Sequence, residues 1–152
     1  MATTHHAHTP WHLWAVGILA LAFTAFGAYD YIMSQLGNRD YIEAAVGGMG
    51  MDVDAAIAYF SGFPLWMDFV WAIGVWGGVA GALLLILRNR LAFPVWAVSL
   101  IALVISNIYG FVEPMPGMTD PTPTYIATAG VFVIMLGLTL YARAMAKRGV
   151  LR

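Results

Sequence analysis

The chain has 152 residues, of which 61% are hydrophobic and 10% charged, and its formal net charge is −1. A water-soluble domain carries about 25% charged residues, so this composition excludes a soluble globule, and the near-neutral charge gives no reason to expect nucleic acid as a partner. The absence of cysteine excludes disulfides, thiolate nucleophiles and cysteine-based metal sites. The length fits one domain, residues 1–152.

Four stretches of the chain are long and apolar enough to cross a membrane. A spanning helix needs about 20 mostly apolar residues, and backbone polar groups in lipid must be satisfied within the segment. No alternation typical of a barrel strand interrupts these stretches. The sequence therefore predicts an all-α, integral membrane, up-down-up-down four-helix bundle, with spans at about 11–36, 64–87, 94–112 and 125–146.

The charged residues predict the orientation of the bundle. Six of the seven Lys/Arg lie in 88–90 or from 143 onward, whereas the acidic residues avoid these segments. By the positive-inside rule, both termini and the hairpin at 88–90 are cytoplasmic, and loops 37–63 and 113–124 face outward. The first apolar run is longer than a signal core and has no Lys or Arg before it, which favours an uncleaved anchor. The expected location is the bacterial inner (cytoplasmic) membrane, with the lipid bilayer as the first partner.

The two outer loops differ in character. Loop 37–63 contains a flexible Gly47–Gly50 segment, after which Asp52 or Asp54 is placed to cap a short helix ending near Phe60. Loop 113–124 holds four prolines, so it is expected to be extended and stiff. Four methionines in these loops are predicted to cover a hydrophobic lid: Met49, Met51, Met115 and Met118.

Small residues line one face of the second span. Gly74, Gly77, Gly78 and Gly81 form interleaved small-xxx-small rows that let helix backbones approach closely in lipid. Contact within the bundle is the first interpretation, and self-association or docking to other membrane-protein subunits is the alternative. Trp71 and Trp76 lie deeper in this span and are expected to pack at specific places. Eight aromatic residues near span ends predict an interfacial belt: Trp11, Trp14, Trp66, Trp96, Tyr29, Tyr31, Tyr125 and Tyr141.

Polar residues gather at similar depth below the outward surface. Ionisable residues inside spans are costly and indicate function by default. Together they predict a ligand-binding acidic cup that opens outward, although Asp68 also suits a structural role in a first helical turn. The predicted ligand-binding residues are Asp30, Ser34, Asp68, Asn107, Tyr109 and Glu113, with Thr128 in the same layer.

Asp30 and Asp68 have no obvious counter-ion in the chain, because Arg39 is the only basic residue on the outer side. Desolvation and a like-charge neighbour both favour the protonated form of a carboxyl group. Three outcomes are open: protonation with hydrogen bonds to Tyr or Asn, pairing with Arg39, or pairing with a cation or partner from outside. His5, His6, His8 and His12 lie at the opposite end and are interpreted as a solvated tail and an interfacial residue, without metal. No cofactor is expected.

Three segments carry a resemblance to known proteins: Phe26–Met33, Trp71–Gly78, and Leu84–Leu87 followed by Arg88–Arg90. They resemble a group of short bacterial four-span membrane proteins, some of which carry the label "sugar transporter". The architecture is similar to that of DoxX-like four-helix membrane proteins. The resemblance implies the multi-pass fold and names no chemistry.

Two function classes follow from these features. No catalytic constellation is present, so we expect no enzyme. The first class is an accessory or assembly subunit of a larger membrane complex, which the small size and the glycine row favour. The alternative is binding or transport of a small cationic, polyol or amphipathic ligand, such as a lipid or quinone headgroup, in the acidic cup. The direction in which Asp30 and Asp68 point discriminates between them.

Overall fold

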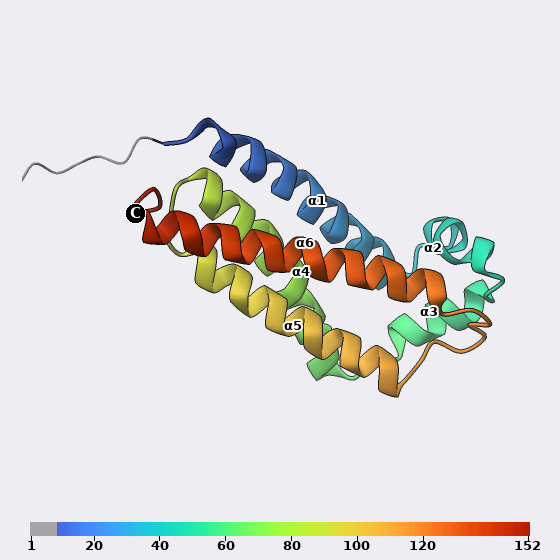
Figure 1. Cartoon of the computed structure of the whole chain (residues 1–152). Helices are drawn as coiled ribbons and strands as arrows, with labels where there is room; N and C mark the ends of the chain where they lie inside the picture. Colours follow the sequence, from blue (N-terminus) through green and yellow to red (C-terminus); the bar gives the residue numbers. More distant parts are fainter. Residues whose placement is uncertain (1–8) are drawn as a thin grey trace, which may run out of the picture.

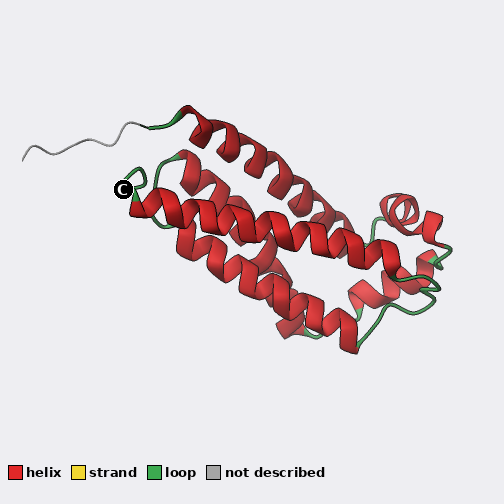
Figure 2. Cartoon of the chain, in the orientation of Figure 1, coloured by secondary structure: helices red, strands yellow, loops and turns green. Residues whose placement is uncertain are grey.

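The computed structural model describes residues 9–152 as an all-α protein (Figures 1 and 2). Its four long helices are apolar and long enough to span a membrane, and they pack as a bundle. The predicted fold class is therefore confirmed, and the protein is an integral membrane protein. His5, His6 and His8 lie outside the described residues. The elements in chain order are α1 (Trp11–Gln35), α2 (Arg39–Val46), the 3-10 helix η1 (Gly47–Met49), α3 (Val53–Ser61), α4 (Leu65–Ile86), α5 (Ala92–Val112) and α6 (Thr122–Lys147).

Neighbouring long helices run antiparallel. The closest pairs are α4 with α5, α1 with α4, and α5 with α6. Figure 1 shows α6 crossing in front of α4, with α1 and α5 on either side. We call the end that holds the 88–90 hairpin and the C-terminal residues the basic end, and the end that holds α2 and α3 the acidic end. At the basic end His12 of α1 meets Tyr141 of α6, with 2.6 Å between Nδ1 and the phenol oxygen.

Backbone motifs at the helix ends make the connections tight. Arg88 has a φ of 58°, and the amides of Arg88 and Asn89 donate to the carbonyls of Leu85 and Leu84. This is the Schellman arrangement, which satisfies the last carbonyls of a helix through a left-handed residue. Gly37 ends α1 in the same way, with its φ of 59° and a hydrogen bond from the Asn38 amide to the Met33 carbonyl. The chain can therefore reverse direction within a few residues.

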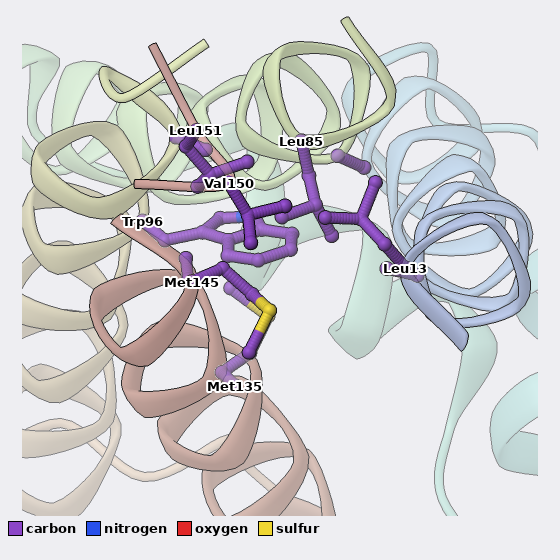
Figure 3. Packing of buried hydrophobic residues seen from close by; sticks show 11 residues of the cluster. Leu13, Leu85, Trp96, Met135, Met145, Val150 and Leu151 are labelled. Carbon is purple, nitrogen blue, oxygen red and sulfur yellow. The ribbon is translucent and has the colours of Figure 1, made fainter. Parts of the chain in front are cut away.

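The main hydrophobic core lies in the basic half of the bundle, where Figure 3 shows Trp96 at its centre. The indole of Trp96 is fully buried, and its Nε1 donates a 2.9 Å hydrogen bond to the Gly78 carbonyl of α4. Trp96 was expected in the interfacial belt; that expectation is wrong. It stands one turn inside α5 on the face toward α4. Trp76, expected to pack specifically, is instead 47% exposed on the lipid-facing surface.

The four glycines of α4 lie against other helices of the same chain. An added Cβ at Gly74 would lie 3.5 Å from the Ala102 Cβ, and one at Gly77 would lie 3.1 Å from the Ser99 Cβ. At Gly78 the nearest atom is the Thr24 Cγ2 of α1, 3.2 Å away, and at Gly81 the indole of Trp96 fills the space. The Ser99 hydroxyl also donates to the Gly74 carbonyl at 2.5 Å. Missing side chains thus allow α1 and α5 to approach α4 closely.

A second, smaller core covers the acidic end, and we call the segment from α2 to α3 that surrounds it, residues 39–61, the lid. Ile42, Val46, Met51 and Ala56 are buried there, with Met49, Met115 and Met118 packed against them. The predicted methionine lid is therefore confirmed. Asp52 caps α3 by accepting a hydrogen bond from the Asp54 amide at 3.0 Å, as predicted. Helix α2, which the sequence analysis did not predict, begins at an Asn38 cap, whose side chain accepts from the Tyr41 amide.

Candidate functional site

The two carboxylates inside the spans have neutral donors from the chain itself. Asp30 Oδ1 accepts a 2.7 Å hydrogen bond from the Tyr41 hydroxyl of α2, and Asp68 Oδ1 accepts one of 3.1 Å from the Gln35 side-chain amide at the end of α1. Both aspartates are half-buried. The first contact fixes the lid to α1, and the second ties α1 to α4. Each carboxylate therefore joins two elements of the fold.

Tyr41 is the donor that the sequence analysis missed. Its ring packs edge-on against Tyr29, with the centroids 5.4 Å apart. Burial, followed by the hydrogen bond to Asp30, raises the pKa of Tyr41 to about 12. The hydroxyl therefore remains a proton donor to Asp30 at neutral pH. Recognition of the Asn38 cap would have indicated α2, but nothing in the pattern shows that this helix folds back onto Asp30.

Arg39 does not pair with either intramembrane aspartate. Its guanidinium forms two hydrogen bonds with the Asp54 carboxylate, at 2.5 and 3.3 Å, on the exposed surface of the lid. The hydrogen bond from Arg39 and its positive charge lower the pKa of Asp54. The same hydrogen bond and the negative charge of Asp54 raise the pKa of Arg39. Of the three outcomes considered for the aspartates, the structure shows hydrogen bonding to a tyrosine for Asp30 and to a glutamine amide for Asp68.

The remaining residues of the polar layer are distributed over several places. Ser34 is buried, and the Asn107 Nδ2 donates to the Leu103 carbonyl of its own helix at 2.7 Å. The Glu113 side chain is exposed, and its backbone carbonyl accepts from the Tyr59 hydroxyl at 2.8 Å. Within residues 9–152, no hydrogen bond or ion pair joins Asp30 to Asp68, or either of them to Asn107 or Tyr109.

Tyr109 belongs to an aromatic cluster that fixes the lid to the bundle. Its ring meets those of Phe63 and Trp66, with both centroid distances 5.5 Å. On the other side, Trp71 contacts Tyr31 of α1 at 4.9 Å and stacks with Phe60 of α3 at 5.7 Å. Edge-to-face and offset pairs of this kind each add about 0.5–1.5 kcal/mol beyond burial. The cluster explains the specific packing expected for Trp71.

A groove of about 330 Å³ lies between α5 and α6. Near the acidic end it is bordered by the stacked rings of Phe111 and Tyr125, with centroids 5.1 Å apart. Asn107 and Thr128 place polar atoms in its wall, roughly 8 and 9 Å inside the helix ends at about 1.5 Å per residue. The other lining residues are apolar: Val104, Ile108, Ala129 and Phe132, besides Phe111 and the ring of Tyr125.

Thr128 and Asn107 in this groove have unused hydrogen-bonding capacity. The Thr128 hydroxyl makes no hydrogen bond to any described residue, whereas the hydroxyls of Thr24 and Thr139, elsewhere in the bundle, donate to carbonyls four residues back in their own helices. Asn107 uses its amide nitrogen as a donor, but its Oδ1 accepts from no described donor. In lipid, such groups favour hydrogen bonds across a helix interface.

Among the described residues, no group of three or more His, Asp and Glu side chains is arranged to hold a metal ion. Comparisons with models of protein families, with curated proteins and with solved structures give no match. The fold and the four apolar helices therefore define the class of the protein: a small integral membrane protein with four candidate spans and a packed lid over one end.

Proposed function

We propose that this protein is a non-catalytic accessory or assembly subunit of a larger membrane complex, and that a transmembrane helix of a partner subunit packs into the α5–α6 groove. The observation that carries the proposal is the position of Asn107 and Thr128, whose unsatisfied polar atoms lie in an apolar groove inside the membrane-spanning part of the chain. Lipid tails offer no hydrogen bonds to such groups, whereas a neighbouring helix does.

The exposed surface of α6 supports this assignment. No residue between Thr122 and Ile134 is buried, although the basic half of the same helix carries Met135, Thr139, Ala142 and Met145 in the core. An added Cβ at Gly130 or Gly137 would meet nothing within 4 Å. These glycines lie seven residues apart, so they share one face of α6. Neither glycine lines the α5–α6 groove, so a partner subunit could also approach the α6 backbone closely from this second face.

The alternative, a ligand in an acidic cup, receives less support. A cationic, polyol or amphipathic ligand, including a quinone headgroup, would need the carboxylates of Asp30 and Asp68 as acceptors. Those carboxylates already accept hydrogen bonds from Tyr41 and Gln35, and the lid core covers this end. A ligand there would have to compete with Tyr41 and Gln35 or use the acceptor sites that these two donors leave on each carboxylate.

The charge distribution supports a location and orientation for the subunit. Six Lys/Arg lie at the basic end or in the last turns of α6, and Arg39 lies on the lid. By the positive-inside rule, the basic end faces the cytoplasm of a bacterial cell and the lid faces outward from the inner membrane. Both termini are then cytoplasmic.

Co-purification in a mild detergent tests the assignment with two matched leucine variants. Ala129→Leu fills part of the groove wall at an exposed position of α6, and Gly27→Leu on α1 places no Cβ within 4 Å of the rest of the chain, so the isolated fold should accept both. We expect the wild-type protein and Gly27→Leu to retain the same membrane-protein subunits in a fixed ratio, measured by mass spectrometry. Ala129→Leu should lose them. A wild-type protein that purifies alone, or equal retention by both variants, would contradict the proposal.

A further inference from the structure

Positive charge accumulates at the basic end without acidic side chains to balance it. Arg88 and Arg90 lie in the hairpin, and Arg143, Lys147, Arg148 and Arg152 lie in or after the last turns of α6. The eight Asp and Glu residues are all between positions 30 and 120, on the lid, the 113–121 loop or the acidic halves of α1 and α4. The local field at the basic end therefore favours anions.

The C-terminal residues and the hairpin are held together at this end. The Arg152 amide donates to the Arg88 carbonyl at 2.8 Å, and the Arg90 amide donates to the Arg152 carbonyl at 3.0 Å. Val150 and Leu151 are buried in the main core, as Figure 3 shows beside Met145. Gly149, with a φ of 71°, allows the chain to turn back after α6. Backbone hydrogen bonds thus hold Arg152 in a fixed position relative to Arg88 and Arg90.

A hollow of about 250 Å³ lies between these two segments. Leu87, Arg88, Asn89 and Arg152 line it. Arg88 is half-buried, and its Nε atom is buried and has no hydrogen-bond partner among residues 9–152, although buried polar atoms are normally hydrogen-bonded. Asn89 uses its Oδ1 to accept from the Leu91 amide at 2.9 Å, which leaves its amide nitrogen available as a donor.

We propose that this hollow binds the phosphate group of an anionic phospholipid. The Arg88 Nε and the Asn89 amide supply donors, Arg152 adds positive charge, and guanidinium groups match phosphate oxygens in geometry and charge. Leu87, the residue directly after α4, is 73% exposed and places apolar surface beside these donors at the level where the spans end. A charged headgroup next to apolar surface at the membrane boundary fits a lipid better than a free anion.

Thermal unfolding of the full chain in a neutral detergent tests the proposal. The probes are phosphatidylglycerol, phosphatidylcholine and inorganic phosphate, each added to the same preparation. We expect phosphatidylglycerol to raise the midpoint temperature by several degrees and the other two to leave it nearly unchanged. Equal stabilisation by both lipids would overturn the proposal. If inorganic phosphate raised the midpoint temperature as much as phosphatidylglycerol does, the hollow would be a site for a free anion, and the proposal would also be overturned.

Charge-neutralising variants locate the site. Arg152→Gln and Arg88→Gln should each weaken phosphatidylglycerol binding, counted by native mass spectrometry, about tenfold or more, because hydrogen bonds to charged groups are stronger than neutral ones. Arg39→Gln removes the same charge on the exposed lid and should leave binding unchanged. If Arg88→Gln does not fold, Arg152→Gln still tests the site, since its backbone hydrogen bonds to the hairpin are retained. An equal loss in Arg39→Gln would show a general charge effect and contradict the site.

Discussion

Replacing Gly81 by alanine should disturb the centre of the main core. The new Cβ would lie 2.7 Å from the Cγ of Trp96 and closer still to Cδ1 and Nε1. The indole cannot easily withdraw, because it is fully buried and bonded to the Gly78 carbonyl. Overpacking costs about 1–3 kcal/mol, and losing the hydrogen bond costs about 0.5–1.5 kcal/mol. Alanine's higher helix propensity returns about 1 kcal/mol, so the net loss is roughly 0.5–3.5 kcal/mol.

The matched control is Gly74→Ala in the same helix. Its Cβ would meet Ala102 at 3.5 Å, an ordinary contact, so its stability should equal or exceed that of the wild type. Unfolding in a mixed-micelle denaturant titration, followed by tryptophan fluorescence, measures both variants. Trp96→Leu should reduce the cost of Gly81→Ala, which gives a non-additive double-mutant cycle. Equal stability of Gly81→Ala and Gly74→Ala would refute the reasoning about this contact.

Three further predictions concern the lid and the core. Tyr41 has a pKa of about 12 in the fold against an ordinary value near 10, so its contribution to stability should be complete below pH 10 and decrease as the pH rises through 12. In Tyr41→Phe the midpoint temperature of unfolding should therefore fall less over this pH range than in the wild type. Equal falls in both proteins would contradict the assignment. Ile42→Ala removes a lid side chain that is 2% exposed. Hydrogen-exchange mass spectrometry should then show faster amide exchange in α2 and α3 while the four long helices stay protected. Uniformly faster exchange would show that the lid and the bundle unfold together. Trp96→Phe deletes the indole donor to Gly78 and should lower the free energy of unfolding by about 1–2 kcal/mol, whereas Trp76→Phe on the lipid-facing surface should change it little.

Much of the fold could be predicted from composition because the membrane sets the length of its helices. Apolar runs of sufficient length indicated all four spans. The largest error at a span boundary was at α6, which begins at Thr122 rather than near 125. Pro123 is compatible with the first turn, where its missing amide hydrogen costs no helical bond. Proline therefore marked the segment as a loop in the sequence although it lies inside the helix.

The contacts between elements could not be read in the same way. Trp96 lies near a span end in sequence, and only the rotation of α5 against α4 shows that its indole enters the space left by Gly81. Asp30 and Asp68 lie in the acidic halves of α1 and α4, but their donors come from α2 and from the end of α1. Those partners depend on how the lid folds back over the bundle, which no periodicity within a single segment encodes.

Cysteine labelling of the intact cell tests the threading of the chain most directly. The native sequence has no cysteine, so single substitutions report without background. Gly48→Cys lies in the exposed part of the lid, and Asn89→Cys lies in the hairpin at the basic end. A membrane-impermeant maleimide should label position 48 in intact cells and position 89 only after lysis. Labelling of position 89 in intact cells, with position 48 protected until lysis, would contradict the orientation.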